Sequence, residues 1–200
     1  MKEEIKEIGR FISKAQALNY VRRWNFYPTT RNESVAEHSF WVAFYSMMLI
    51  LINADRAQTR EEVAEILTAA LFHDLEESIT GDMPTLVKRY NNDWKMTTQM
   101  AMDELVGENE LLSQVRNWKE WSEEPSVCAA IVKIADTVAA MMYSREQSHC
   151  QPVFKSIYDQ IATGLRGYKD NAGLQTLLDA LGVDAKPCAG YTQKMTHLGE

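Results

Sequence analysis

The sequence has few cysteines, fewer basic than acidic residues, and no long uninterrupted apolar run. The three cysteines, Cys128, Cys150 and Cys188, are odd in number and show no C-x-x-C spacing, which argues against a disulfide framework and against a cysteine-based zinc site. No apolar run approaches the roughly 20 residues that a membrane span needs, and Met1–Glu4 lacks the apolar core of a signal peptide. We therefore expect a cytoplasmic protein with no membrane partner.

The excess of acidic residues gives the chain a formal net charge of −7 at pH 7. Proteins that follow the phosphates of a nucleic acid rely on clustered lysines and arginines, so this charge predicts that nucleic acid is not a partner. A small anionic substrate remains compatible with it, because salt screens surface charge over about 8 Å. A metal ion and a few arginines can therefore dominate the potential inside a cleft.

What the sequence does contain is a 3.6-residue apolar period along almost its whole length, without the alternation that marks strands. At 200 residues the chain is long enough for one substantial core and too short for two comfortable domains. The pattern predicts a single compact all-α domain over 1–182 and a loosely held tail over 183–200. Helices are expected over about 3–19, 34–53, 59 to a break at 80–84, 94–106, 110–121, 125–146, 152–166 and 172–181.

Two of these helices begin with a capping-box pattern, in which Ser or Thr is followed three residues later by Glu. The segments Ser34–Glu37 and Thr59–Glu62 carry it. The first places His38 in the opening turns of its helix. Pro125 is expected at the first position of a later helix, where a proline costs no hydrogen bond.

Two histidines and two aspartates in apolar surroundings indicate a metal site. His73 and Asp74 follow the apolar run Ala69–Phe72, His38 lies upstream, and Asp136 interrupts the apolar stripe of a later helix. Burying an unpaired carboxylate costs several kcal/mol. An ion pair with arginine is one alternative, and either histidine alone is typical of an ordinary core residue. Together the four side chains, from three helices, favour a first-row divalent ion with open positions for water and substrate.

These motifs resemble the HD-domain metal phosphohydrolase superfamily, and within it the bacterial 5′-deoxynucleotidases and their phage-encoded relatives that act on deoxynucleoside triphosphates. The likeness runs from about residue 22 to 143 and rests on Arg23-Trp24, Ser34–Ser39, His73-Asp74-x-x-Glu77, Thr80–Thr85 and Lys133-x-x-Asp136. It implies an HD-domain fold and a divalent metal ion: cobalt, manganese, zinc or magnesium. Because related deoxynucleotidases commonly associate, it also implies a homodimer or larger homo-oligomer.

The resemblance also implies roles for individual residues. Four of them would bind the metal: His38, His73, Asp74 and Asp136. Glu77 would orient or deprotonate the attacking water, and Asp82 would serve as a second acid or act at the leaving group. Arg23 would contact phosphate through planar paired donors. Trp24 would pack on the deoxyribose and leave little room for a 2′-hydroxyl.

Several of these residues also have simpler interpretations. Glu77 is equally typical of a solvated helix end, Asp82 of a turn after a glycine, and Trp24 of a core anchor. Phe26, two residues after Trp24, is placed to flank the base. Lys88 is by default a surface charge, although its position favours contact with a longer phosphate chain.

The predicted function is hydrolysis of the 5′-phosphoester of 2′-deoxynucleoside monophosphates, which releases a deoxynucleoside. One alternative is a deoxynucleoside triphosphate triphosphohydrolase of the phage type, with an adenine preference. Another is a non-catalytic helical protein that binds nucleotides. The helix over 34–53 is apolar on all sides and must be buried on all sides, either within its own domain or against a second subunit; its large apolar residues include Phe40, Trp41, Phe44, Tyr45, Met47 and Met48.

Overall fold

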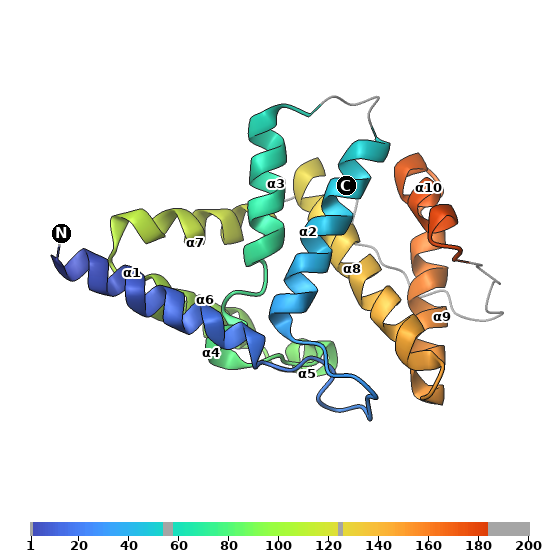
Figure 1. The fold of residues 1–200 in the computed structure, drawn as a ribbon, viewed down its shortest axis with the longest axis horizontal. Coiled ribbons are helices and arrows are strands. Elements are labelled where there is room, and N and C mark those ends of the chain that lie inside the picture. The colour runs from blue at the N-terminus through green and yellow to red at the C-terminus, as the bar shows by residue number, and fades with distance from the viewer. Residues whose placement is uncertain (1, 54–57, 124–125, 184–200) are drawn as a thin grey trace.

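The structure is a computed structural model that describes residues 2–53, 58–123 and 126–183 (Figure 1). Over these residues the chain is helical, and its only β-type contact is a single antiparallel bridge between Arg22 and Ser34. The all-α prediction is confirmed. The helices are α1 (Lys2–Ala15), α2 (Val35–Ile52), α3 (Arg60–Phe72), α4 (Glu77–Thr80), α5 (Thr85–Tyr90), α6 (Trp94–Val106), α7 (Glu110–Glu123), α8 (Val127–Ser148), α9 (Pro152–Arg166) and α10 (Ala172–Ala180), with a 3₁₀ turn η1 (Gln16–Asn19).

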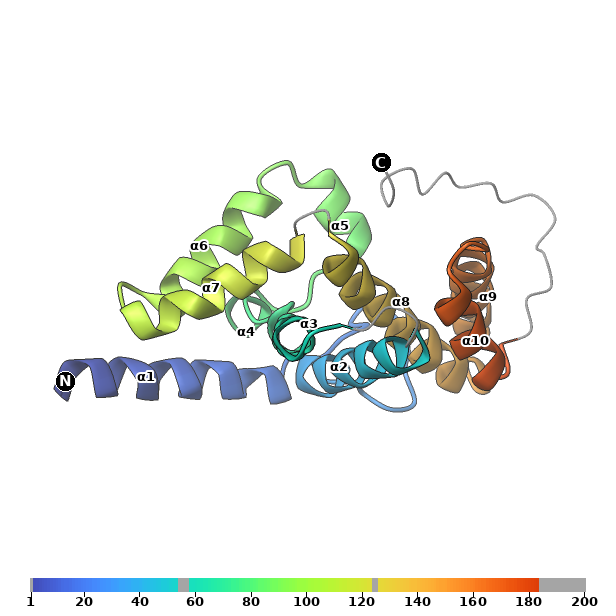
Figure 2. The same ribbon diagram turned by 90° about the horizontal axis from the view of Figure 1, so that it is seen from above.

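Helices α2 and α8 pack against each other at the centre of the molecule (Figures 1 and 2). The larger apolar core surrounds this pair and is completed by α3, α9 and α10. A smaller core lies at the other end, where α1, α6 and α7 meet the start of α2. Both flanking groups of helices thus cover part of α2, while its Phe40, Trp41 and Phe44 stay exposed.

The two cores meet where the predicted metal ligands lie. On α2, Val35 belongs to the smaller core and Val42 to the larger one, with His38 between them. At the end of α3, Ala70 belongs to the larger core, and Leu75 in the following turn belongs to the smaller one, with His73 and Asp74 between. Apolar residues on both sides therefore anchor the backbone that presents these polar side chains.

Both predicted capping boxes are present. The backbone N–H of Glu37 donates to Ser34 Oγ at 3.1 Å, while the backbone N–H of Ser34 donates to Glu37 Oε2 at 3.0 Å. Thr59 and Glu62 exchange the same pair of hydrogen bonds at the start of α3. Each box satisfies backbone donors that a helix start leaves open, which typically stabilises the helix by about 1 kcal/mol.

Several predicted boundaries are wrong. The helix expected over 3–19 ends at Ala15 and continues as the 3₁₀ turn η1. The helix expected from residue 59 to the break at 80–84 ends at Phe72, and α4 is a separate short helix. Helix α5 was not predicted. Helix α8 begins at Val127 with Ser126 as its cap, and Pro125 lies outside the described residues.

The predicted tail begins with a residue that is packed. Val183 is buried in the larger core, and its backbone N–H donates to the carbonyl of Leu178 at 3.0 Å. Residues 184–200 lie outside the described part of the chain.

Length and composition alone would allow α2 and α8 to cross a membrane, contrary to the expectation that no segment is long enough. About half of each helix is buried within the protein itself, with 44% of the apolar window in α2 and 50% in α8. Core helices of this kind pass the same test, so it is weak evidence for a membrane span.

Candidate active site

The loop that precedes α2 is fastened at both ends and in its middle. The backbone N–H of Arg23 donates to the carbonyl of Glu33 at 2.9 Å, which closes the base of the loop. In the middle, the backbone N–H of Thr30 donates to the buried Gln147 Oε1 at 2.8 Å, and the Tyr143 hydroxyl donates to the carbonyl of Arg31. These contacts fix the segment that carries Arg23 and Trp24 against α8.

His38 lies fully buried on the second turn of α2. Its Nε2 is 2.9 Å from Asp136 Oδ1 on α8 and 3.9 Å from Asp74 Oδ2. The packing of α2 on α8 therefore brings together two residues that are far apart in the sequence. Burial, reinforced by the nearby Arg23 guanidinium, lowers the pKa of His38 to about 4.

His73 and Asp74 lie in a tight turn between α3 and α4. The His73 Nδ1–H donates to the carbonyl of Ala70 at 2.8 Å. This hydrogen bond leaves Nε2 as the inward-facing ring nitrogen, 3.1 Å from Asp74 Oδ2. Burial opposes a charge on the imidazole, yet the Asp74 carboxylate outweighs it and raises the pKa of His73 to about 9.

Three of the predicted ligands form a compact cluster. The ligand atoms of His38, His73 and Asp74 lie within 4.8 Å of one another. Asp136 is outside that cluster but touches it through His38, and its side chain is 41% exposed. Two imidazoles and two carboxylates suit a divalent transition metal. The Ala70 carbonyl on His73 is the kind of outer contact that orients a metal-binding histidine. The residues present fit a metal ion.

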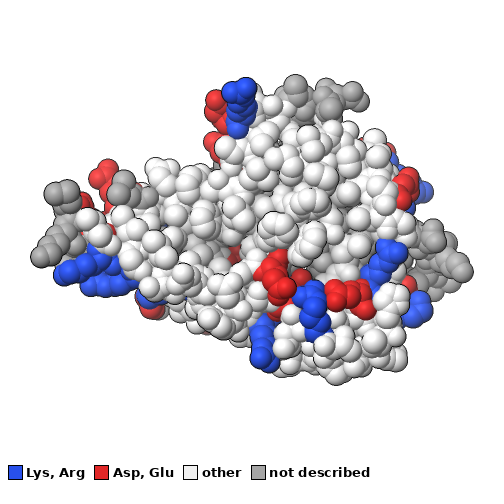
Figure 3. Space-filling model, viewed as in Figure 1, with Lys and Arg blue, Asp and Glu red and all other residues white. Residues whose placement is uncertain are grey.

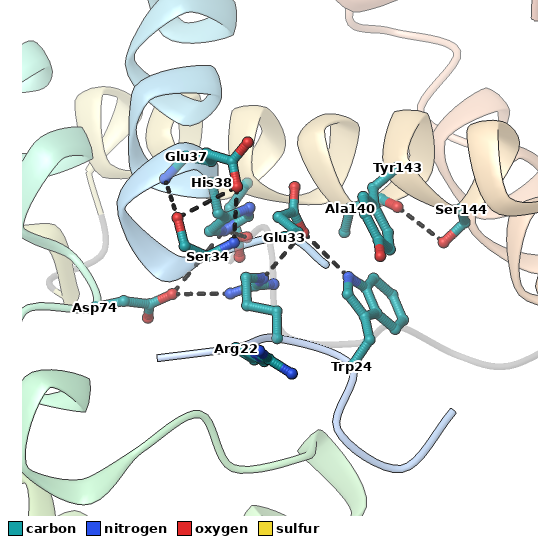
Figure 4. Close-up of polar contacts among 12 residues, drawn as sticks. Arg22, Trp24, Glu33, Ser34, Glu37, His38, Asp74, Ala140, Tyr143 and Ser144 are labelled. Carbon is teal, nitrogen blue, oxygen red and sulfur yellow. Dashed lines mark hydrogen bonds and ion pairs between the residues drawn. The ribbon is translucent and has the colours of Figure 1, made fainter. Parts of the chain in front are cut away.

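A positive charge balances the acids of the cluster. Arg23 Nη1 donates to Asp74 Oδ2 at 3.2 Å, and Arg23 Nε is 3.4 Å from Glu33 Oε2. In Figure 4, dashed lines run from the labelled Asp74 and Glu33 to one guanidinium. Burial favours a protonated Asp74, but His73 and Arg23 outweigh it and hold the pKa of this carboxyl well below its usual range. Arg23 therefore lies beside the cluster of predicted ligands.

Glu77 and Lys88 form a second charged pair beside the cluster. Glu77 is 1% exposed and accepts a hydrogen bond from Lys88 Nζ at 3.0 Å. The prediction that Glu77 projects from the same helix as His73 is wrong, because Glu77 begins α4 after the turn. Burial and the charge of Asp74 raise the pKa of Glu77 to about 8. A solvated helix end, the simpler interpretation of this residue, does not match its burial.

Asp82 follows Gly81, whose φ of 73° is in the left-handed region that favours glycine. The Asp82 carboxyl accepts a hydrogen bond from the backbone N–H of Trp24. Burial raises the pKa of Asp82, and Arg23 and Lys88 partly offset this effect. This hydrogen bond links the turn after α4 to the loop that precedes α2.

Trp24 lies on this loop, and its indole packs in a group of aromatic side chains. Its indole stacks on Tyr143 at a centroid distance of 5.6 Å and meets Phe154 edge-on at 5.4 Å. Its Nε1–H donates to Glu33 Oε2 at 3.1 Å. Phe26, by contrast, is 69% exposed. The sequence analysis missed Glu33, Tyr143 and Phe154, since each is unremarkable for its type in its segment.

A pocket of about 400 Å³ opens beside Glu33, along α2 and α8. Trp41 and Tyr45 on α2 and Tyr143 on α8 contribute its aromatic walls, and Arg31 lies at its rim. None of the predicted metal ligands or substrate contacts lines it, so Glu33 separates this pocket from the metal cluster.

Comparison with known proteins gives the family. Residues 10–180 match the model of the YfbR-like 5′-deoxynucleotidases. The chain belongs to this family. A 5′-deoxynucleotidase of Pectobacterium atrosepticum is 31% identical over 145 residues, which cover 70% of this chain and 73% of that protein. The 5′-deoxynucleotidase YfbR of Salmonella arizonae is 30% identical over 148 residues, with coverage of 70% and 73%.

Solved structures agree on the fold of the family. An HD-domain phosphohydrolase from Listeria innocua has a TM-score of 0.71 at 18% identity and covers 86% of each chain. The cyanophage S-2L HD phosphohydrolase DatZ, bound to dA and one catalytic Zn²⁺ ion, has a TM-score of 0.59 at 18% identity and covers 84% of this chain and 94% of its own. The predicted HD-domain fold is confirmed.

Family membership also settles the class of protein. The chain belongs to a family of 5′-deoxynucleotidases, so the prediction of an enzyme is confirmed and the non-catalytic alternative is not favoured. In this chain the His38, His73 and Asp74 cluster can hold a metal ion, and the cyanophage neighbour carries one catalytic zinc ion.

Proposed function

We propose that this protein hydrolyses the 5′-phosphoester of 2′-deoxynucleoside monophosphates and releases a deoxynucleoside and inorganic phosphate. The observation that carries the proposal is the contact between Arg23 and the cluster of candidate metal ligands. The Arg23 guanidinium, a group that binds phosphate well, lies 3.2 Å from the Asp74 carboxylate, a group that binds metal ions well. A phosphoester that binds beside this pair meets both kinds of group at once.

In this proposal His38, His73, Asp74 and Asp136 hold the ion. A bound divalent ion supplies Lewis acidity, which eases the deprotonation of water and neutralises charge on the phosphoryl group. The low pKa of His38 keeps its imidazole neutral at pH 7, the form in which a histidine binds metal, whereas His73, with a pKa of about 9, must release a proton when the ion binds. The preference among cobalt, manganese, zinc and magnesium remains to be measured by metal replacement.

The acids of the site then divide the proton transfers. The Glu77 carboxylate accepts a proton from the attacking water, whose oxygen forms a bond to phosphorus as the bond from phosphorus to O5′ breaks. Asp82, whose pKa is raised by burial, donates a proton to the leaving O5′. Proton transfer of this kind contributes roughly 10²–10⁴-fold to the rate. Lys88 is paired with Glu77 and lies within reach of phosphate oxygens.

We assign substrate selection to the loop that precedes α2. Arg23 contacts the phosphate, and Trp24 packs on the deoxyribose so that a 2′-hydroxyl is excluded. Phe26, which is exposed, is free to flank the base. Substituting Trp24→Ala removes the bulk of the indole, and we expect the preference for deoxyribonucleotides to narrow. An unchanged ratio of the two activities would assign Trp24 to packing alone.

The experiment that tests the function is a substrate screen with phosphate release as the readout. The metal-free protein is supplied with Co²⁺, Mn²⁺, Zn²⁺ or Mg²⁺ and offered deoxy- and ribonucleoside monophosphates and deoxynucleoside triphosphates. We expect inorganic phosphate from the deoxynucleoside monophosphates. Release of inorganic triphosphate from the triphosphates, with the monophosphates unused, would establish the phage-type alternative instead.

We further infer that the protein is a homodimer through one face of α2. Phe40, Trp41 and Phe44 are 57%, 41% and 43% exposed and pack against one another at centroid distances of 5.4 to 6.5 Å. Figure 3 shows almost no charged side chain over the middle of α2 and α3, while charged side chains lie at the top of α3 and below the start of α2. Exposed apolar residues that gather on one face in this way mark interaction sites.

Light scattering at micromolar concentration tests the dimer. We expect a mass of twice the 22.9 kDa chain, and a return to the single-chain mass for Phe40→Glu, because a buried unpaired charge opposes association. Tyr90→Glu is the matched control: it adds the same charge at an exposed aromatic residue on α5. A single-chain mass for the unmodified protein would refute the dimer.

A further inference from the structure

Glu33 is a buried acid that contacts Arg23 and Trp24, the two residues that we propose bind the phosphate and the deoxyribose of the substrate. Its side chain is 2% exposed, and its Oε2 accepts the hydrogen bond from Trp24 Nε1 at 3.1 Å. The same oxygen lies 3.4 Å from Arg23 Nε. Figure 4 shows Glu33 between Asp74 and Trp24, with dashed contacts to the indole and to the guanidinium. One carboxyl group therefore touches both neighbours in the sequence Arg23-Trp24.

Trp24 depends on outside contacts for its conformation. Its φ is 63°, in the left-handed region, where a bulky residue is rare and costs about 1–3 kcal/mol. Stacking on Tyr143 fixes the plane of the indole. The hydrogen bond to Glu33 fixes which edge of the indole faces inward, because the ring has a single N–H and a reversed ring would leave that donor and a buried acid without each other.

Arg23 depends on the same acid. Its guanidinium contacts Asp74 through Nη1 and Glu33 through the Nε side. In the proposed function Asp74 also serves the metal, so the Arg23–Asp74 attraction is shared. Glu33 then contacts the Nε end of the guanidinium, so the outer N–H groups of Arg23 remain available to phosphate.

We propose that Glu33 is a positioning residue: its carboxyl group orients the Trp24 indole and the Arg23 guanidinium, and through them sets the selection of deoxyribonucleoside over ribonucleoside monophosphates. This inference rests on the proposed function for its kinetic consequence. The orientation of Trp24 is measurable without substrate.

The kinetic test compares three substitutions at one position. Glu33→Ala removes the acceptor, and we expect the ratio of kcat/KM for deoxy over ribo substrates to fall about tenfold, the scale of one charge-assisted hydrogen bond. Glu33→Gln keeps an oxygen that accepts from the indole and should restore the ratio to within about twofold, while KM rises because the charge beside Arg23 is gone. Glu33→Asp retracts the carboxyl by one methylene and should behave like Glu33→Ala, so the test stands if the alanine variant fails to fold.

The matched control is Glu146→Gln, which removes an exposed acid on α8 that pairs with Arg31 rather than with Arg23 or Trp24. It should change neither the ratio nor KM. A double-mutant cycle with Trp24→Phe, which lacks the indole N–H, isolates the coupling. In that background Glu33→Ala should leave the ratio unchanged. A ratio preserved in both Glu33→Ala and Glu33→Asp would overturn the proposal.

A second readout separates this proposal from the proposed function. The indole N–H signals of the ¹⁵N-labelled protein are recorded without substrate, and the Trp24 signal is identified by its loss in Trp24→Phe. We expect Glu33→Ala to shift it strongly and Glu146→Gln to leave it in place. An unmoved signal would refute the positioning role even in an active enzyme. A shifted signal in a protein that releases no phosphate would instead leave the positioning intact and refute the proposed function.

Discussion

The burial of Glu33 predicts a specific dependence of stability on pH. Burial raises the pKa of this carboxyl from 4.5 to about 7, against the opposing effects of Arg23 and of the hydrogen bond from Trp24. Because the folded state then binds a proton more tightly than the unfolded state, the free energy of unfolding falls as the pH rises from about 4.5 to 7. At 1.36 kcal/mol per pKa unit, the loss is about 3 kcal/mol, and it levels off above pH 7.

The substitution Glu33→Gln removes the titration while keeping the shape of the side chain. We expect the wild-type protein to lose about 2 kcal/mol relative to this variant between pH 5 and pH 7.5, because part of the total loss of about 3 kcal/mol falls outside this window. Urea unfolding of the metal-free proteins, followed by circular dichroism at several pH values, measures the difference. The groups common to both proteins cancel in this comparison, and metal binding does not contribute.

A difference between the two proteins that stays constant from pH 5 to pH 7.5 would refute the reasoning. It would mean that the ion pair with Arg23 and the hydrogen bond from Trp24 fully compensate for burial. A difference that changes in the opposite direction would mean that they outweigh it, so that the carboxylate is the favoured form in the folded protein.

Three further results follow from the site and its supports. Asp136→Ala should reduce bound metal well below one ion per chain while the helical circular dichroism is retained; full metal content by elemental analysis would show that Asp136 is not a ligand. Glu77→Gln should keep the metal but lose roughly 10²-fold or more in kcat, the scale of a positioned base; near-normal turnover would remove that role. Phe154→Ala should destabilise the fold by about 3–5 kcal/mol, because this fully buried ring supports Trp24, whereas Phe154→Leu should cost much less. Equal losses for the two variants, measured by urea unfolding, would contradict a packing role for the ring.

The sequence predicted the fold class and the candidate ligands because both rest on local patterns. The capping boxes before α2 and α3 are short motifs whose partners are three residues apart. An acid in an apolar stripe needs a charged or metal partner in any fold, so these acids could be singled out from the sequence alone. A period of 3.6 residues was enough to identify most helices.

The end of α3 was missed because its cause is not local. Nothing in the residues from His73 to Glu76 breaks a helix by propensity, yet Leu75 packs into the smaller core while Ala70 packs into the larger one. The other buried residues of the smaller core come from distant parts of the chain, so the residues near the turn do not reveal it. Glu33 was missed for a similar reason: its partners, Arg23 and Trp24, meet it only when the loop closes on itself.

The three-part origin of the candidate ligands has a consequence for the synthesis of the protein. His38 leaves the ribosome with α2, Asp74 follows after α3, and Asp136 emerges only with α8. A chain that ends before α8 has the cluster of His38, His73 and Asp74 without Asp136, so we expect it to bind the ion less tightly than the finished protein. A ligand that binds only the native state stabilises it by about 4 kcal/mol at a free concentration of 1,000 times its Kd. Metal binding would thus stabilise the complete protein more than truncated chains, because only the complete protein has every candidate ligand.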